Sequence, residues 1–319
     1  MIDLCDGLLS SQPHYEFGLR SIVSVLRSAG DFKKSKPDED EHYVISKALQ
    51  TVKYCELLPQ DQTMFRQILD KMFHQCPPEP LPDEFLKNAI INQCEENNLE
   101  GTPHFLSKVQ QLYDMMDLSD GVMLLGDSYG GKTTATKMLA ASLQQVAGAN
   151  KRALTCVILN PKAMKIDQLY GCFLKDEWKD GILATNFRQF SALPREERKW
   201  LIFDGPVDSE WIENMNTVLD ENKKLCLMSG EIITLPPNTN LIFEAQDVES
   251  ASPATISRCG VLYMDPECME WDLIIKTWIK TFPRFIPESI RDKLILMFSR
   301  FCVPLLRVSL HSHFFPFNL

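Results

Sequence analysis

Apolar residues recur at two different spacings along the chain, and the spacing changes near residue 120. Before that point they recur at helical spacing, which predicts amphipathic helices over 1–29, 41–57, 61–73, 83–97 and 103–116. Gly30 is expected to end the first helix, and residues 33–41 to form a solvated, charged linker. A proline-rich stretch over 76–82 interrupts the pattern and predicts a domain boundary.

After residue 120, short apolar runs alternate with helical stretches. The runs have the length of buried strands and lie at 121–125, 153–159, 200–203, 241–245 and 261–264. A Ser-Gly pair at 229–230, between two further short runs, predicts a β-hairpin. Strands that alternate with helices indicate a parallel sheet covered by helices on both faces, so the predicted fold class is α/β. From residue 269 the pattern is helical again.

The composition is that of an ordinary globular protein, and it narrows the choice of partners. The 319 residues are 45% hydrophobic and 24% charged, with a net charge of −10. This acidic balance argues against nucleic acid as a partner, and no apolar run reaches the roughly 18 residues of a membrane span. The ten cysteines form no C-x-x-C pair and no signal peptide is recognisable, so we expect a reducing, cytoplasmic environment.

The segment 126–133 matches the phosphate-binding pattern G-x-x-x-x-G-K-[ST] at every fixed position. Glycines let backbone N–H groups turn toward a phosphate, Lys132 supplies a positive charge, and the Thr133 hydroxyl can ligate Mg²⁺. The strand expected before the segment and the helix expected after it are the required context. The predicted ATP-binding residues are Gly126, Asp127, Ser128, Tyr129, Gly130, Gly131, Lys132, Thr133 and Thr134.

Asp204 is the candidate for the second half of this site. It ends an apolar strand, where an acid can hold Mg²⁺, usually through water; the alternative is a turn or helix-capping aspartate. In ring-forming ATPases the next residue is normally a glutamate that acts as general base, but here it is Gly205. The nearest carboxylate, Asp208, follows Pro206 and is expected to turn away. These residues predict nucleotide binding with little hydrolysis.

Arg258, in a Ser-Arg-Cys-Gly segment, is a further candidate. An arginine at the edge of such a domain can reach the γ-phosphate held by a neighbouring subunit and stabilise transition-state charge there. On the residues alone, a surface arginine in a salt bridge is the favoured interpretation.

Longer motifs then follow one another in a fixed order, and each has several specific residues. They are GDSYGGKT (126–133), NPK (160–162), LYG (169–171), WKDG (178–181), FDGPVD (203–208), WIENMNTVLD (211–220) and SPATISRCG (252–260). Together they resemble the dynein heavy chain family, and most closely the second AAA+ module of axonemal dyneins. The resemblance spans roughly residues 100–265 and implies a P-loop AAA+ domain that binds ATP and Mg²⁺.

Residues 9–20 resemble the end of the first module's helical lid in the same family. The resemblance implies that Arg20 senses the nucleotide of that first module, and that Arg258 is an arginine finger directed in trans at the same nucleotide. It also implies four segments. Residues 1–76 would be the C-terminal part of the preceding lid, 77–118 a linker with leading helices, 119–266 the large α/β nucleotide-binding domain, and 267–319 a truncated lid with an atypical tail.

The resemblance further implies partners and a location. The partners would be the remaining modules of the dynein heavy chain and the dynein intermediate and light chains, with microtubules engaged only through the full-length protein. The location would be the cytoplasm and cytoskeleton, in the axoneme of a cilium. The stalk and linker of such motors have no counterpart in the 319 residues, so motor activity is expected of a longer parent protein.

Two alternatives remain open from the sequence. A truncated, non-catalytic product would act only by docking to other heavy-chain segments, and ATP binding by the purified chain separates this hypothesis from the first. An independent P-loop kinase would need a substrate lid and a local catalytic acid or arginine cluster, and neither is recognisable in the sequence.

Overall fold

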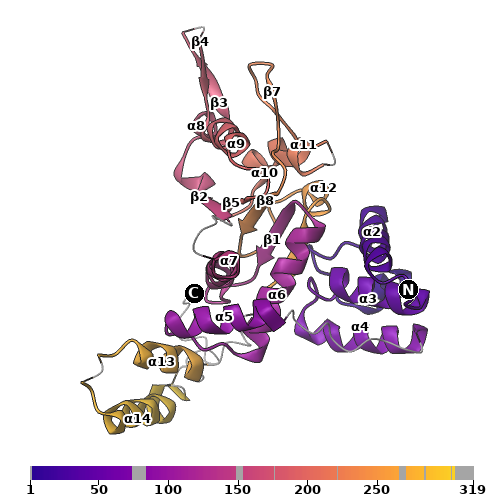
Figure 1. The fold of residues 1–319 in the computed structure, drawn as a ribbon. Helices are drawn as coiled ribbons and strands as arrows, with labels where there is room; N and C mark the ends of the chain where they lie inside the picture. The colour runs from indigo at the N-terminus through magenta and orange to yellow at the C-terminus, as the bar shows by residue number, and fades with distance from the viewer. Residues whose placement is uncertain are drawn as a thin grey trace.

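The computed structural model describes residues 2–73, 84–148, 154–175, 177–220, 222–265, 271–283, 285–302 and 304–305. Its first part is helical and consists of α1 (Ile2–Leu8), α2 (Leu19–Ser35), α3 (Glu41–Lys53) and α4 (Pro59–Met72) (Figure 1). These helices enclose a core of their own, with Leu57, Phe65 and Leu69 at its centre. The predicted boundary over 76–82 and the atypical tail over 308–319 lie outside the described residues.

The single helix predicted over 1–29 is wrong, because the chain breaks between α1 and α2. Asp61 of α4 binds the segment that separates the two helices. Its carboxylate accepts hydrogen bonds from the Ser10 backbone N–H at 3.1 Å and from the Tyr15 hydroxyl at 2.7 Å. A side chain from a distant helix therefore offers this segment a hydrogen-bonding alternative to the helix.

Gly30 does not end the helix as predicted, but lies within α2. Lys33 and Lys34, expected in the charged linker, instead form the last turn of α2. Positive charge is favourable there because the carbonyl end of a helix carries a partial negative charge. The exposed linker is correspondingly shorter and begins at Lys36.

A five-stranded parallel sheet forms the centre of the second part. Its strands are β1 (Gly121–Leu125), β2 (Leu154–Leu159), β5 (Arg198–Asp204), β8 (Thr239–Glu244) and β9 (Gly260–Tyr263). They lie in the order β2-β5-β8-β1-β9, and each adjacent pair is parallel. The five predicted strands and the α/β fold class are confirmed. Because β8 lies between β1 and β5, the residues that follow these three strands meet at one edge of the sheet.

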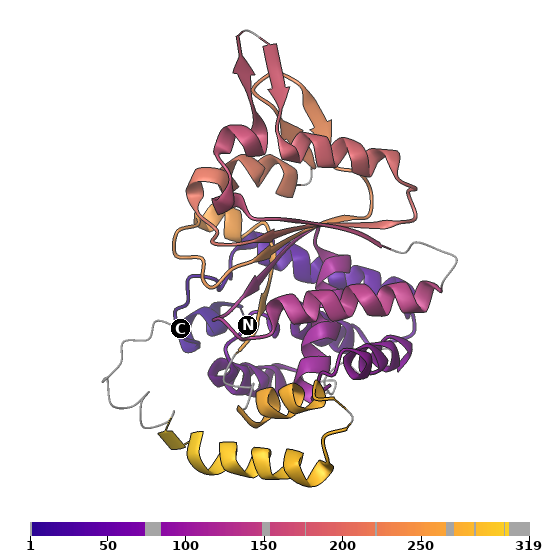
Figure 2. The same ribbon diagram turned by 90° about the vertical axis from the view of Figure 1, so that its left-hand side faces the viewer.

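Helices cover both faces of the sheet (Figure 2). One face carries α5 (Glu84–Glu96), α6 (Pro103–Leu118) and α7 (Lys132–Ala147); the other carries α8 (Ile166–Tyr170), α9 (Ile182–Ala192), α10 (Ser209–Ile212) and α11 (Asn216–Leu219). Successive strand side chains point to opposite faces. Val122 and Leu124 of β1 accordingly pack with the first group of helices, and Met123 and Leu125 with the second. Short elements η1 (Pro161–Ala163), η2 (Glu213–Met215) and α12 (Pro253–Ile256) connect the layers.

Helices α5 and α6, predicted as the approach to the large domain, share the core of its sheet. Leu86 of α5 and Leu112 of α6 are buried in the same cluster as Trp200 of β5. Helix α6 begins at Pro103, and the Thr102 side chain accepts a hydrogen bond from the Phe105 N–H at 3.2 Å. Such a cap satisfies a backbone donor that the helix itself leaves unpaired.

Two antiparallel hairpins extend away from the sheet (Figures 1 and 2). The predicted one joins β6 (Lys224–Cys226) to β7 (Ile232–Thr234), and Gly230 in its turn has a φ of +86°. The other joins β3 (Gly171–Leu174) to β4 (Glu177–Asp180) and was not predicted, because no Gly or Asn marks its turn. Lys175 takes the left-handed conformation there, with a φ of +49°.

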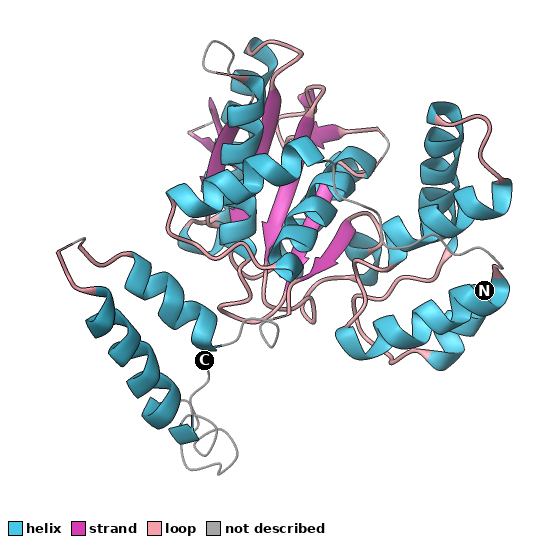
Figure 3. Ribbon diagram, turned by 60° about the horizontal axis from the view of Figure 1, so that its bottom comes forward, coloured by secondary structure: helices cyan, strands magenta, loops and turns pink. Residues whose placement is uncertain are grey.

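The N-terminal helices contact the edge of the sheet at β9. The Tyr263 N–H donates to the Cys55 carbonyl at 3.1 Å, and the His14 ring stacks on the Tyr263 ring with centroids 5.7 Å apart. On the other side of the sheet domain lie α13 (Trp271–Lys280), α14 (Glu288–Met297) and the π-helical turn Phe298–Cys302 (Figure 3). An ion pair of 2.8 Å between Lys280 and Glu100 connects α13 to the sheet domain.

Within the described ranges, no helix is both long and apolar enough to cross a bilayer. The eight cysteines in those ranges carry free thiols, and Cys5, Cys55 and Cys94 are buried. These three pack as small apolar side chains, whereas Cys156 and Cys226 are exposed.

Candidate nucleotide-binding site

The phosphate-loop segment connects β1 to α7, as the sequence predicts. Two of its glycines are required by close packing against the backbone that follows β9. A Cβ atom on Gly126, whose φ is +138°, would lie 2.1 Å from the Met264 carbonyl oxygen, and one on Gly130 would lie 2.8 Å from it. Tyr129 at the tip of the loop is exposed and has a left-handed φ of +67°. The loop is thus shaped by its backbone and leaves its tip open to solvent.

Lys132, the first residue of α7, turns back over the loop. Its ammonium group donates to the Asp127 carbonyl at 2.9 Å and also to the Gly126 carbonyl. Burial lowers the pKa of Lys132, while the charges of Glu244, Asp127 and Asp204 act in the opposite direction. The predicted loop lysine and the predicted strand acid therefore lie close enough to interact.

The Thr133 hydroxyl has a partner that the sequence did not reveal. It donates to the carboxylate of Glu244, which also accepts a hydrogen bond from the Thr136 hydroxyl at 2.9 Å. Glu244 is the last residue of β8 and is only 4% exposed. In the sequence it reads as the polar end of an apolar strand, so only the position of β8 beside β1 brings it to the loop.

Asp204 ends β5 and lies beside Glu244, its partner in the parallel register. Its side chain is exposed, as a group that holds a metal through water requires. The adjoining Gly205 has a φ of +157°, and a Cβ there would lie 3.2 Å from the Asn160 side-chain oxygen. The position that carries a general base in ring-forming ATPases is therefore both without a side chain and sterically restricted.

Asp208 does not replace the missing base. Its carboxylate forms an ion pair of 2.5 Å with Lys162, which follows β2. Its side chain is 17% exposed, whereas that of Lys162 is 52% exposed, so water reaches the pair from the lysine. A carboxylate held by a lysine is poorly placed to accept a proton from an attacking water.

The donor set at the carboxyl edge of the sheet suits a hard divalent cation. The Thr133 hydroxyl and the Asp204 and Glu244 carboxylates all present oxygen atoms, which Mg²⁺ prefers. The residues present therefore fit Mg²⁺ bound together with a polyphosphate.

Arg20 and Arg258, the two remaining predicted site residues, lie together at another place in the molecule. Arg258 donates from Nε to the Asp220 carboxylate at 2.6 Å and from Nη2 at 3.3 Å. Arg20 reaches the same carboxylate at 3.8 Å and donates to the Ser257 hydroxyl at 2.7 Å. Arg258 forms a salt bridge, as the interpretation from the residues alone expects, but its side chain is only 16% exposed and so is less accessible than a surface arginine.

The arginine cluster, which is Arg20, Arg258 and Asp220, lies at the opposite edge of the sheet from the phosphate loop. Arg258 comes just before β9, and the loop comes just after β1. Because β1 and β9 are parallel, the start of one and the end of the other are separated by the length of a strand, roughly 13–17 Å. The cluster therefore cannot act on a nucleotide held by the loop of the same chain.

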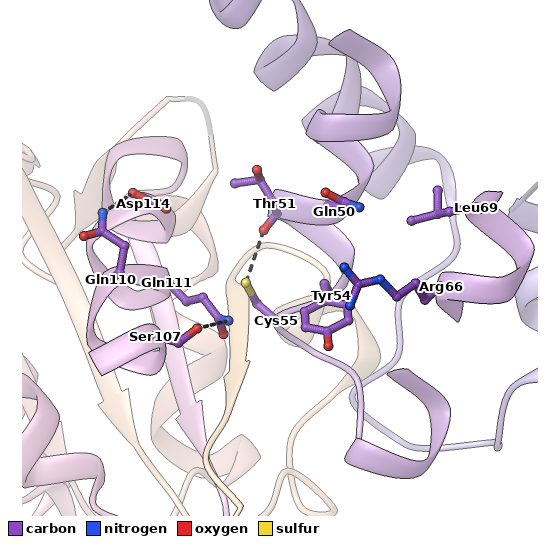
Figure 4. Close-up of a pocket in the computed structure, with 10 residues that line it drawn as sticks. All are labelled: Gln50, Thr51, Tyr54, Cys55, Arg66, Leu69, Ser107, Gln110, Gln111 and Asp114. Carbon is purple, nitrogen blue, oxygen red and sulfur yellow. Dashed lines mark hydrogen bonds between the residues drawn. The ribbon is translucent and has the colours of Figure 1, made fainter. Parts of the chain in front are cut away.

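A cavity of about 50 Å³ lies between the N-terminal helices and α6 (Figure 4). Cys55 and Thr51 of the α3 region face Gln111 and Asp114 of α6 across it. Burial raises the pKa of Asp114, whose carboxylate accepts from the Gln110 amide at 2.9 Å. This volume fits about one or two water molecules, so the cavity is not the nucleotide site.

Two family models match the chain. One is described as the hydrolytic ATP binding site of the dynein motor region and matches residues 1–133. The other is described as an AAA domain of the dynein-related subfamily and matches residues 121–259. The second match contains the phosphate loop, Asp204, Glu244 and Arg258.

Similar curated proteins are axonemal dynein heavy chains. The chain is 44% identical to dynein axonemal heavy chain 3 of Mus musculus and 43% identical to the Homo sapiens protein of that name, over 98% of this chain and 8% of each relative. It is 40% identical to dynein axonemal heavy chain 6 of Homo sapiens, over 94% of this chain and 7% of the relative. The chain thus spans less than a tenth of the length of these relatives.

Proposed function

The chain belongs to the dynein heavy chain family, and we propose that its second part is an AAA+ module that binds ATP with Mg²⁺ at residues 126–134. One observation carries the proposal. The loop lysine Lys132, the loop hydroxyl of Thr133 and the strand acid Asp204 converge at one edge of the sheet. Lys132 would bind the outer phosphates, Thr133 the cation, and Asp204 the cation's water shell.

Bound Mg²⁺ would neutralise part of the phosphate charge, and the protein groups would fix the position of the nucleotide. Lys132 has to leave the Gly126 and Asp127 carbonyls to reach a phosphate. This exchange replaces neutral acceptors by a charged one, and charge-assisted hydrogen bonds are the stronger kind. The N–H groups at the start of α7 add a partial positive charge on the same side.

Hydrolysis at this site is expected to be slow, so the bound nucleotide would serve mainly a structural purpose. Gly205 supplies no base, and Asp208 is held by Lys162. General acid–base catalysis by a positioned side chain contributes typically about 10²–10⁴-fold to a rate. Its loss would leave binding intact while turnover falls.

The arginine cluster would serve the preceding module of a ring. The cluster lies at the amino ends of the strands, too far from the chain's own phosphate loop to contact a nucleotide there. This position supports a nucleotide held by another module as the target of the cluster. Arg258 would act as an arginine finger in trans, and Arg20 as the sensor of that same nucleotide. The 16% exposure of Arg258 means that Asp220 must release it for this contact.

We also propose the division of the chain on which this function rests. Residues 1–76 would be the C-terminal part of a preceding lid, 119–266 a large nucleotide-binding domain, and 267–319 the start of the next lid. The intervening helices α5 and α6 would belong with the large domain, whose core they share. The whole motor would bind microtubules, work with other heavy-chain modules and with intermediate and light chains, and act in the cytoskeleton of a ciliary axoneme.

A second candidate, a protein that acts only by docking, is favoured by a different observation. Lys132 and Thr133 both already have protein partners, so neither requires a nucleotide to satisfy its hydrogen bonds. Isothermal calorimetry of the purified chain with ATP and Mg²⁺ tests both candidates. Saturable binding at one site supports the nucleotide-binding function, and its absence supports the docking function. Phosphate transfer from ATP to a small acceptor would instead indicate a kinase.

A further inference from the structure

Glu244 places a buried negative charge at the loop. The residue is 4% exposed, and its carboxylate accepts hydrogen bonds from two hydroxyl groups, those of Thr133 and Thr136. The backbone reinforces the position, because the Gly205 N–H donates to the Glu244 carbonyl at 3.2 Å. The side chain therefore has little freedom to move away when a ligand binds.

The charges around the loop do not favour a bare polyphosphate. Glu244, Asp127 and Asp204 all act on the single ammonium group of Lys132. Asp127 is exposed and accepts from the Gln246 amide at 2.9 Å, and Asp204 is exposed as well, so solvent screens both. Glu244 is buried, so its charge is screened least of the three.

Glu244 also accepts a hydrogen bond from the Thr133 hydroxyl, which the proposed function assigns as a ligand of the cation. The Thr133 hydroxyl has one hydrogen and two lone pairs, so it can donate to Glu244 and still present a lone pair to a cation. A divalent cation at that lone pair would lie near the Glu244 carboxylate and offset its charge. A nucleotide without a cation leaves the carboxylate facing the phosphates.

We propose that Glu244 makes the loop selective for a nucleoside triphosphate complexed with a divalent cation and excludes the metal-free nucleotide. The proposal rests on the proposed function, because it concerns the same site. Asp204 sets the position of the cation, whereas Glu244 lowers the affinity of the loop for a nucleotide that has no bound cation.

The test compares the ATP affinity of the complete chain in excess Mg²⁺ and in excess chelator. Glu244→Gln keeps the shape and removes the charge. We expect this variant to bind ATP in chelator at least about tenfold more tightly than the parent, as the removal of a poorly screened like charge requires. In Mg²⁺ the variant should bind ATP no more tightly than the parent, because the cation already offsets the Glu244 charge. Glu95→Gln, which removes an exposed charge on α5 outside the loop, should change neither value by more than about twofold.

An equal change in affinity with and without Mg²⁺, or no gain in chelator, overturns the proposal. If the parent does not bind ATP even in Mg²⁺, the proposed function fails. In that case the proposal about Glu244 is supported if the Glu244→Gln variant binds ATP in chelator. It is overturned if that variant does not bind ATP. A thermal melt shows whether the variant is folded. The double variant Glu244→Met, Thr136→Val removes the carboxylate together with one hydroxyl donor, and it decides the question by the same criteria if Glu244→Gln is unfolded.

Discussion

Arg20 and Arg258 both donate a hydrogen bond to the backbone carbonyl of Ala254, although they come from the two different parts of the chain. Asp220 is their shared counter-ion. Two guanidinium groups repel each other, so their proximity depends on this one carboxylate. The cluster therefore holds the N-terminal helices and the sheet domain in a fixed relation at the edge that faces away from the phosphate loop.

Arg258→Ala should leave ATP binding at Lys132 unchanged within about twofold, because the cluster lies a strand length away. In the complete motor the same change should reduce ATP turnover and microtubule gliding, since an arginine supplied in trans can contribute about 10³–10⁵ to a phosphoryl-transfer rate. Calorimetry on the chain and gliding assays on the full heavy chain measure the two effects. A full-length variant that glides at the parent's speed would reduce Arg258 to a structural arginine.

Lys132→Ala should remove most of the affinity for ATP in Mg²⁺. A charge-assisted hydrogen bond contributes about 1.5–3 kcal/mol, which corresponds to roughly 10–150-fold in the dissociation constant. Lys137→Ala is the matched control, because Lys137 is exposed on the same helix outside the loop. Calorimetry that gives both variants the parent's affinity would refute the site assignment.

Turnover of ATP by the chain should be slow and should not depend on Asp208. The Asp208→Asn variant is expected to hydrolyse ATP at the parent's rate, because the Asp208 carboxylate is paired with Lys162. Single-turnover assays with radiolabelled ATP measure this rate. Brisk hydrolysis that persists in the variant would show that a base is present elsewhere.

Gly205→Ala should lower the free energy of unfolding by about 1–3 kcal/mol, because its φ of +157° and the nearby Asn160 oxygen disfavour a Cβ atom. Gly30→Ala is the contrasting control and should stabilise the protein by roughly 0.5–1 kcal/mol, since Gly30 lies in the open interior of α2. Urea denaturation measures both. The Gly205→Glu variant should hydrolyse ATP faster than the parent, but with the same loss of stability. A Gly205→Ala variant as stable as the parent would show that the backbone at residue 205 does not disfavour a side chain.

His14 should make stability depend on pH. Burial lowers the pKa of His14, which stacks on Tyr263 and donates to the Glu56 carbonyl at 3.1 Å. The unfolded chain therefore binds more protons than the folded one below about pH 6.5, so this contribution to stability is present above that pH and is lost as the pH falls.

The His14→Phe variant should lose less stability than the parent between pH 7 and pH 5, as measured by urea denaturation at each pH. Burial raises the pKa of Glu56, which has the opposite effect, but both proteins share it and it cancels in the comparison. The exposed His42, changed to Phe, is the control. Parallel pH curves for parent and His14→Phe would show that His14 does not contribute.

Local patterns accounted for the elements of the sheet and the loop, because each depends on residues close together in the sequence. The apolar run before Gly126 and the acid that ends β5 could be recognised without any tertiary contact. Glu244 could not, since its role depends on β8 lying between β1 and β5. Two other features also depend on residues far apart in the sequence. They are the pairing of Asp220 with two arginines and the break between α1 and α2, where Asp61 accepts hydrogen bonds.

Strand β9 is the last strand on its side of the sheet, and the Tyr263 N–H finds its acceptor at Cys55 in the N-terminal helices. An uncovered strand edge invites pairing with a strand of another molecule. The helices that precede the sheet therefore protect it from self-association, although they carry a core of their own. The cooperative folding unit is then the N-terminal helices together with the sheet that follows them, and a protein without residues 2–73 would be prone to aggregate before it could bind any nucleotide.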